Sequence, residues 1–226
     1  MRRLIHTRDW TVAAFLFFGM VIFIACQPPA TVDEPASALA VKLTVIDTDA
    51  TPSDGKVPVV MQFFFDGKYV KLAGNASVSC NGVTLTDHGI GFAERVPILP
   101  PGGAYTFQHS RGGVNTTVSI AVPPRPVITS PTAGASVART SNLTINYVAG
   151  GGSGIRGSAG DASTGKSGAV QPDNGTYTGL DVSTFQVGAG RVGITREFEN
   201  THSGGSGFSS VESKYSSGSS VNVNWQ

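Results

Sequence analysis

Short runs of alternating apolar and polar residues recur along this chain, and turn dipeptides that contain glycine separate them. The run from Val41 to Val45 would place its apolar side chains on one face, because successive side chains of a strand point to opposite sides. The runs 59–65 and 68–72 flank Asp66-Gly67, a dipeptide that tolerates the backbone of a two-residue hairpin turn. No stretch after residue 38 shows a helical stripe. The pattern predicts an all-β fold.

Two more hairpins and a proline-rich segment divide the rest of the chain. Asn81-Gly82 and Arg111-Gly112-Gly113 each lie between alternating runs, so residues 39–122 are predicted to form one sandwich. Pro123-Pro124-Arg125-Pro126 holds three prolines, which remove backbone donors and favour extended chain. We therefore expect a stiff hinge at 123–126 and a second domain at 127–226.

The second half has strand patterns that are separated by glycine-rich sequence. Strands are predicted at 191–200, 208–215 and 219–225. The segment from Gly150 to Gly168 is rich in glycine and serine and has few apolar anchors. It is predicted to be a long mobile loop or an irregular strand pair.

Two segments resemble known sandwich domains. Residues 99–107, a proline-glycine turn followed by an aromatic strand, resemble a feature near the end of many immunoglobulin-like surface sandwiches. Residues 126–147 are similar to the first strands of bacterial immunoglobulin-like or fibronectin-type domains, in which a proline-flanked segment precedes a core strand. The resemblance implies two tandem antiparallel β-sandwich domains of the immunoglobulin-like class.

The N-terminus has the pattern of an export signal. Arg2, Arg3 and Arg8 precede an apolar run of about 15 residues, which is too short for a stable membrane span but fits a signal helix. The run ends in Phe23-Ile24-Ala25-Cys26, which resembles the lipobox of bacterial lipoproteins, although Phe23 and Ile24 depart from the usual residues.

The lipobox resemblance implies a place for the mature protein. A signal peptide at 1–25 would be removed, Cys26 would carry lipid, and 26–38 would form a flexible stalk. We expect a membrane-anchored, extracytoplasmic protein at the cell surface or periplasmic face. The alternative, an uncleaved signal anchor, leaves the topology unchanged.

Charge and cysteine content exclude some partners. The chain has 16 basic and 15 acidic residues without a basic cluster, so nucleic acid is not an expected partner. The two cysteines are Cys26 and Cys80. If Cys26 carries lipid, Cys80 has no intrachain partner, and its strand pattern predicts a buried, unreactive thiol.

Residues 160–167, Gly-Asp-Ala-Ser-Thr-Gly-Lys-Ser, satisfy the phosphate-binding P-loop pattern. A working P-loop follows a buried apolar strand and opens a helix, whose N-terminal amides hold the phosphates. Neither element is predicted around this segment. We therefore expect no bound nucleotide and no cofactor.

Candidate site residues are few. Tyr69, Tyr105, Tyr177 and Tyr215 could stack on a sugar ring or contact another partner, and the leading hypothesis is a non-enzymatic binding or spacer module. Its partner would be cell wall, polysaccharide or a surface protein. The alternative is a hydrolase or metal-dependent enzyme with its site near Asp87, His88 and His109. The histidine spacing matches no metal site, so no metal ligand is predicted.

Overall fold

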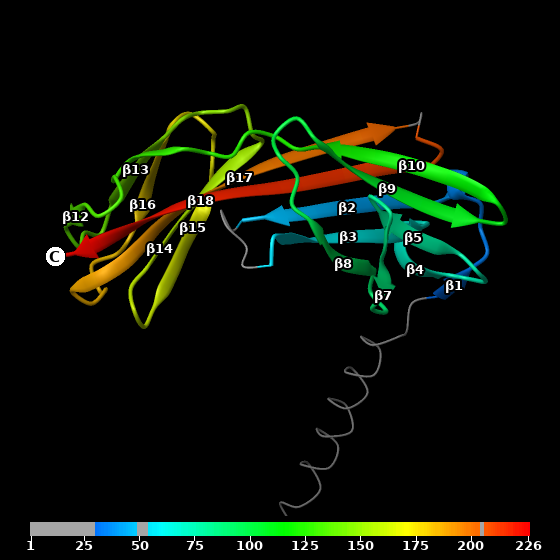
Figure 1. Cartoon of the computed structure of the whole chain (residues 1–226), viewed down its shortest axis with the longest axis horizontal. Helices are drawn as coiled ribbons and strands as arrows, with labels where there is room; N and C mark the ends of the chain where they lie inside the picture. The colour runs from blue at the N-terminus through cyan, green and yellow to red at the C-terminus, as the bar shows by residue number, and fades with distance from the viewer. Residues whose placement is uncertain (1–29, 49–53, 204–205) are drawn as a thin grey trace, which may run out of the picture. The chain divides into compact units, whose positions relative to one another are not determined.

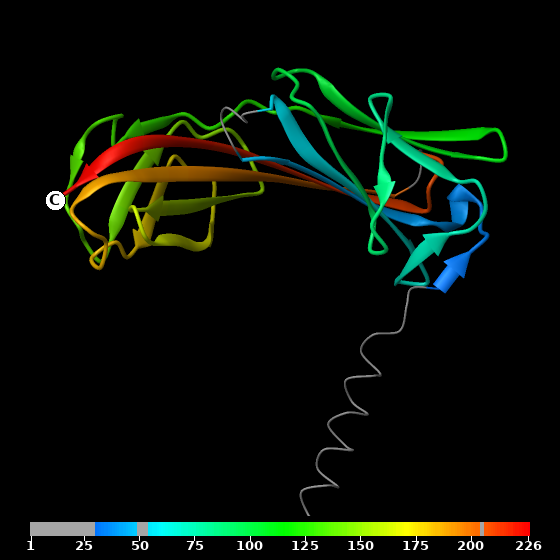
Figure 2. The ribbon, with the colours of Figure 1, turned by 60° about the horizontal axis from the view of Figure 1, so that its bottom comes forward.

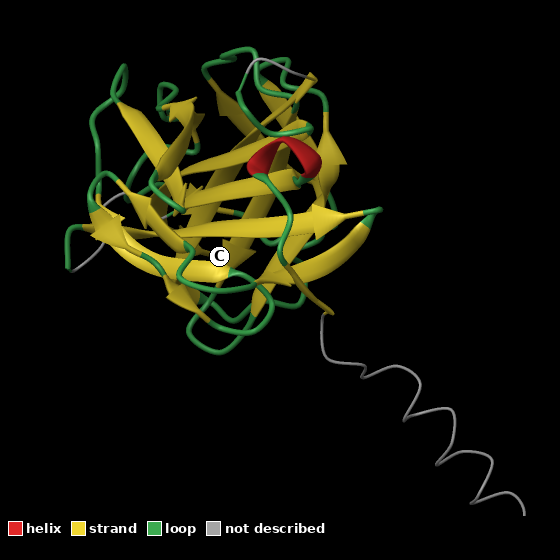
Figure 3. Ribbon diagram, turned by 90° about the vertical axis from the view of Figure 1, so that its right-hand side faces the viewer, coloured by secondary structure: helices red, strands yellow, loops and turns green. Residues whose placement is uncertain are grey.

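The computed structural model describes residues 30–48, 54–203 and 206–226. Strands and loops make up these segments, and the short 3₁₀ turn η1 (Ala36–Ala38) is the one helical element among them (Figure 3). The prediction of an all-β fold is confirmed.

The first half of the chain contributes the strands β1 to β10. Their bounds are β1 (Ala30–Val32), β2 (Ala40–Asp47), β3 (Lys56–Phe65), β4 (Lys68–Leu72), β5 (Ser77–Cys80), β6 (Val83–Thr84), β7 (Thr86–Asp87), β8 (Phe92–Pro97), β9 (Ala104–Arg111) and β10 (Val114–Ala121).

The second half contributes the strands β11 to β18. Their bounds are β11 (Ile128–Ser130), β12 (Ser136–Val137), β13 (Leu143–Tyr147), β14 (Gly154–Gly160), β15 (Gly165–Gln171), β16 (Thr176–Leu180), β17 (Gly188–Ser203) and β18 (Ser210–Trp225).

Two sheets enclose a first core (Figure 1). One sheet has the neighbours β1, β4, β3, β2 and β18, and the other has β10, β9, β5 and β6. Leu43 and Met61 of the first sheet and Tyr105 and Phe107 of the second are buried in this core. The apolar positions that alternate along each strand therefore meet between the sheets.

A second core lies between other strands. The large sheet continues from β18 through β17 and β14 to β15, while β11, β13 and β16 form a separate small sheet. Ile145 and Tyr177 of the small sheet and Val192 and Trp225 of the large sheet are buried together. This core is distinct from the first.

The strands β17 and β18 belong to both cores (Figure 2). They pair without interruption from Gly188 opposite Trp225 to Ser203 opposite Ser210. The first half of β18 also pairs with β2, and that pair is parallel, whereas most other pairs are antiparallel. Val211 and Tyr215 lie in the first core although the sequence places them in the predicted second domain. The predicted tandem arrangement is not confirmed, because one hairpin builds both cores.

The predicted hairpins are present with the expected turns. β3 and β4 meet at Asp66 and Gly67, which have φ of 50° and 70°, so a glycine or aspartate suits this left-handed backbone. Asn81-Gly82 likewise joins β5 to β6. Between β9 and β10 the turn residues are Gly112 and Gly113, and Arg111 is the last residue of β9.

The glycine-rich segment 150–168 is a strand pair. β14 pairs with β15, with a register shift between Arg156 and Ser158. The alternative of an irregular strand pair was therefore correct, and the long mobile loop was wrong. Glycine and serine have no large apolar side chains to bury. The segment is ordered instead by backbone hydrogen bonds of β14 to both β15 and β17.

The segment predicted as a stalk also contacts the folded part. From residue 30 onward it holds β1 and η1, and the side chains of Val32 and Ala36 pack against the first core. Cys26 and the signal segment lie outside the described residues. Among the described residues, no helix has the length and apolar character needed to cross a membrane.

A row of buried polar residues crosses the large sheet between the two cores. Ser217 of β18 is opposite Asp47 of β2 on one side and opposite Arg196 of β17 on the other. All three are at most 2% exposed. We call Asp47, Ser217 and Arg196 the polar row.

The proline-rich segment is tied to the polar row. The Arg125 guanidinium forms an ion pair with Asp47 and donates to the Gly218 carbonyl at 3.0 Å. The Tyr215 hydroxyl donates to the other Asp47 oxygen at 2.8 Å. Burial, followed by this hydrogen bond to Asp47, raises the pKa of Tyr215. These contacts fix the linker between the first ten strands and the rest against the sheet.

Arg196 has its own buried partner. Its Nε lies 2.7 Å from an oxygen of Asp173, and both side chains are 2% exposed. Burial raises the pKa of Asp173, but hydrogen bonds from the Gly152 N–H and Arg196 outweigh it, so the net pKa lies below the ordinary value. Removing one partner would leave a buried charge, which costs about 3–5 kcal/mol. The pair holds the loop after β15 against β17.

We predict that the two cores unfold together. In residues 31–226, which form one compact unit, Trp225 is the only tryptophan and reports on the second core. Leu43→Ala opens a cavity in the first core and should cost about 2–5 kcal/mol. β18 contributes residues to both cores. The urea midpoint measured by Trp225 fluorescence should therefore fall by the same amount as the midpoint measured by far-UV circular dichroism.

The exposed Thr117→Ala change is the control and should leave both midpoints in place. If Leu43→Ala leaves the midpoint of the Trp225 fluorescence transition unchanged, the two cores unfold independently.

Candidate functional site

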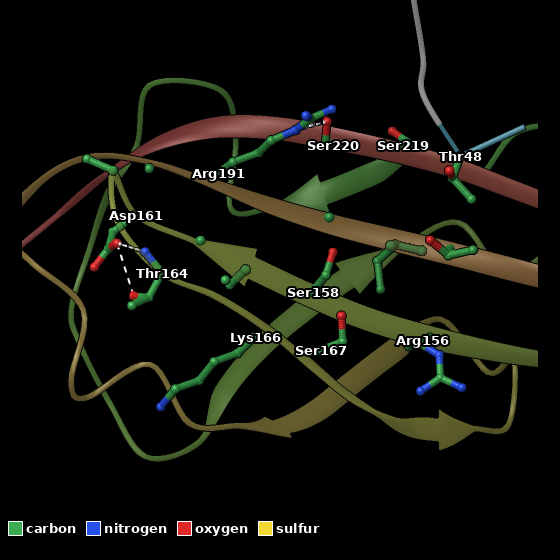
Figure 4. Close-up of a pocket in the computed structure, with 18 of the residues that line it drawn as sticks. Thr48, Arg156, Ser158, Asp161, Thr164, Lys166, Ser167, Arg191, Ser219 and Ser220 are labelled. Atoms are coloured by element: carbon green, nitrogen blue, oxygen red, sulfur yellow. Dashed lines mark hydrogen bonds between the residues drawn. The ribbon is translucent and has the colours of Figure 1, made fainter. Parts of the chain in front are cut away.

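A large hollow lies on the outer face of the large sheet, over β14, β15, β17 and β18 (Figure 4). Its volume is about 1040 Å³, and its lining is mostly serine, threonine and glycine. We call it the outer-face groove. It lies on the side of the sheet opposite the second core, because core residues such as Val192 alternate with groove residues such as Arg191.

The floor of the outer-face groove is made of small residues in register. Ser167 of β15, Ser158 of β14, Gly193 of β17 and Ser220 of β18 are opposite one another in turn. A Cβ at Gly193 would lie 2.7 Å from the Ser158 hydroxyl, so a larger residue there would require that hydroxyl to move. The result is a shallow floor that offers hydroxyl groups between glycine and other small residues.

Two arginines flank this floor. Arg156 donates through Nη1 to the Gly168 carbonyl at 2.8 Å, and Arg191 donates through Nε to the Ser220 hydroxyl at 2.6 Å. Each bond holds a guanidinium in place and leaves its other N–H groups for a ligand. Lys166, in contrast, points away from Ser167 and forms an ion pair with Asp181 at 3.8 Å (Figure 4).

The P-loop pattern at 160–167 forms one end of the outer-face groove as a hairpin turn. β14 ends at Gly160 and β15 begins at Gly165. Asp161 accepts hydrogen bonds from the N–H groups of Gln186, Ser163 and Thr164 at 2.7, 2.7 and 2.6 Å, and these bonds lower its pKa. Asp161 therefore shapes the turn, and a strand rather than a helix follows the motif.

Three of the four candidate tyrosines are core residues. Tyr105, Tyr177 and Tyr215 are at most 1% exposed, so they cannot stack on a surface ligand, and the prediction is wrong for them. Each has a structural role instead. The Tyr105 hydroxyl accepts from the Leu99 N–H, and the Tyr177 hydroxyl donates to the Ala169 carbonyl. Aromatic residues at strand spacing pack inward when their face meets a second sheet.

Tyr69 is the candidate tyrosine that remains partly exposed. Its ring packs edge-on against Phe64 with centroids 6.0 Å apart. Burial and then the charge of Asp87 raise its pKa. A hollow of about 320 Å³ lies next to Phe64 and is lined by Lys42 and Glu212 among others. The Phe64–Tyr69 pair is a second surface feature, on the sheet of the first core.

The three residues of the enzyme alternative, Asp87, His88 and His109, do not form a common site. Asp87 is exposed and accepts from the Gly89 N–H at 2.7 Å, and His88 is exposed in the turn that follows. His109 is 2% exposed, and its ring lies against Phe63 and Phe208 in the first core. His109 is buried because its face of β9 turns toward the opposite sheet. The described residues hold no cluster of three or more potential metal ligands.

Cys80 is buried as predicted. It is 0% exposed, and burial raises the pKa of its thiol to about 12. The thiolate, which is the reactive form, is therefore scarce at neutral pH.

Sequence reasoning missed the outer-face groove. Arg156, Ser158 and Gly160 alternate with the apolar or small residues Ile155, Gly157 and Ala159, which is a strand pattern. The glycines weakened that signal, because glycine marks no face. Arg191 was placed in a predicted strand, but its neighbours across the sheet could not be read from the sequence.

No protein-family model matches the sequence, and no curated protein is significantly similar to it. The chain is similar to fibronectin(III)-like modules of CbhA from Clostridium thermocellum, with 10% identity over 86% of this chain and 92% of that chain and a TM-score of 0.30. For the DIP-gamma domains IG1 and IG2 the identity is 11%, the coverages are 85% and 97%, and the TM-score is 0.22. At these scores the likeness carries no argument about function.

We predict that His109 makes stability depend on pH. Burial lowers its pKa below the ordinary value of about 6.5, so the unfolded chain binds more protons just below that pH. Stability should therefore fall as the pH is lowered from about 7 to 5. In His109→Phe this slope, measured from urea midpoints, should be reduced.

The exposed His88→Gln change serves as the control and should keep the wild-type slope. An unchanged slope in His109→Phe would assign the pH dependence to other groups.

Proposed function

We propose that this protein is a membrane-anchored, extracytoplasmic module without enzymatic activity, which binds a partner at the cell surface through the outer-face groove. The groove is the observation that carries the proposal. It combines a large hollow, lined mostly by serine, threonine and glycine, with two positioned arginines, whereas Asp87, His88 and His109 lie in different environments.

The framework supports a role in presenting a surface. The outer-face groove is built on β17 and β18, and these strands also build both cores. The ion pairs Arg125–Asp47 and Arg196–Asp173 hold the loops beside them. A groove on such a sheet keeps its shape without ligand, so little ordering entropy is lost on binding. The same rigidity suits a spacer.

The Phe64–Tyr69 pair favours a second candidate function, the stacking of a sugar ring. Its two rings are partly exposed and lie on strands that flank a tight turn. An aromatic face provides apolar contact for the C–H face of a sugar. This site would act on the sheet of the first core, separately from the outer-face groove.

We predict that Cys26 carries the anchor. When the full chain is expressed in a bacterial host fed labelled palmitate, the protein should take up label and sediment with membranes. Cys26→Ala should abolish the labelling, because the thiol is the acceptor. Cys80→Ala is the matched control and should remain labelled, since that thiol is buried. Labelled Cys26→Ala protein, or unlabelled wild type, would refute a lipid anchor at this residue.

We also predict that the outer-face groove binds cell-envelope material. Residues 31–226 should sediment saturably with isolated envelopes or cell walls. Ser167→Trp should weaken this binding by about tenfold or more, because an exposed serine on the groove floor is replaced by a bulky ring. Thr117→Trp, at an exposed strand position of the first sandwich, should bind as wild type does. Equal binding by both variants would place the contact elsewhere.

A further inference from the structure

The arginines of the described residues differ in how their charge is balanced. Arg95, Arg111, Arg125 and Arg196 each have a carboxylate within ion-pair distance. Arg139 donates to the carbonyls of Gln226, just after β18, and of Phe185, in the connection between β16 and β17. Among the residues that the structure describes, the remaining two have no acidic partner, and both line the outer-face groove. They are Arg156 and Arg191.

Their spacing defines the kind of ligand that could use both. The Arg156 guanidinium is bonded to Gly168 of β15 and the Arg191 guanidinium to Ser220 of β18, and the strands β14 and β17 lie between β15 and β18. At about 4.8 Å between neighbouring strands, the two anchoring points are about 14 Å apart across the sheet. A single carboxylate or phosphate cannot bridge that distance. A chain with repeated negative charges can, and each guanidinium fork matches one carboxylate.

The side chains of the groove floor indicate which kind of negatively charged polymer would fit. Between the arginines it offers the hydroxyls of Ser158, Ser167 and Ser220, which can donate to and accept from a hydroxyl-rich chain. Among the described residues that line it, none is aromatic, so a neutral sugar would lack its usual stacking face. Ile194 is the one large apolar residue among the described residues that line the groove, so an acidic peptide would find little to hold its own apolar side chains.

We infer that the outer-face groove binds an acidic polysaccharide, with Arg156 and Arg191 pairing with carboxylates of two separate sugar units. The inference rests on the proposed binding function and names its ligand class. The Gly168 carbonyl and the Ser220 hydroxyl position the two guanidinium groups before the ligand arrives. The serine hydroxyls of the floor bond the sugar units between the two charges.

The test is affinity electrophoresis of the full chain, extracted in detergent, in gels that contain polygalacturonate, dextran sulfate, polyglutamate or neutral dextran. Polygalacturonate should retard the wild type most. Arg156→Gln/Arg191→Gln should raise its apparent dissociation constant about tenfold or more, since two charge-assisted contacts are lost. Added salt should weaken the wild type more than the variant.

A matched control removes the same charge elsewhere. Lys56→Gln/Lys68→Gln changes two exposed lysines of β3 and β4, outside the groove, and should alter binding less than about twofold. Equal weakening by both double variants would overturn the inference, because it would show nonspecific attraction. Stronger retardation by dextran sulfate or polyglutamate would also overturn it, in favour of a sulfate or a peptide ligand.

Two outcomes separate this inference from the proposed function. If Arg156→Gln/Arg191→Gln still binds envelopes as wild type does while Ser167→Trp does not, the groove binds its partner without the arginines, and only the acidic ligand is refuted. If Ser167→Trp and the wild type bind envelopes equally, the groove itself is not the binding site.

Discussion

The polar row of Asp47, Ser217 and Arg196 is the constraint around which both cores are arranged. Three polar residues at adjacent positions of a buried sheet are costly unless each finds a partner. The Ser217 hydroxyl has no hydrogen-bond partner among the described residues. The two charged members have partners: Asp47 pairs with Arg125 of the proline-rich linker, and Arg196 pairs with Asp173 of the loop after β15. The proline-rich linker and the loop after β15 are thereby both bound to the polar row between the two cores.

The outer-face groove follows from the same sheet. Because β17 and β18 continue past the polar row, their outer faces extend beside β14 and β15 as one surface. Serine and glycine contribute no apolar side chains there, and the backbone ladder and the second core beneath supply the stability. That arrangement leaves the surface free for polar contacts, and Arg156 and Arg191 place two positive charges on it, with the Asp161 carboxylate in the turn at one end.

Local features were predictable because local physics decides them. Asp66-Gly67 and Asn81-Gly82 adopt the positive φ that their turns require, and the alternation of Val41 to Val45 shows which side chains are buried. The exposure of Tyr105, Tyr177 and Tyr215 was predicted wrongly. Alternation places a tyrosine on one face of a strand, but only the packing of a second sheet decides whether that face is buried.

From the sequence alone came the all-β class, the hairpin turns, the buried Cys80 and the lipobox resemblance, since each depends on residues close together in the chain. The tertiary structure alone decided the parallel pairing of β2 with β18 and the course of β18 through Ser216 to Ser220 as one strand. The sequence predicted two strands there, because serine and glycine carry no strand signal. Pairing with β17 on one side and β2 on the other supplies the hydrogen bonds that keep this segment extended, and such non-local pairing leaves no local pattern to read.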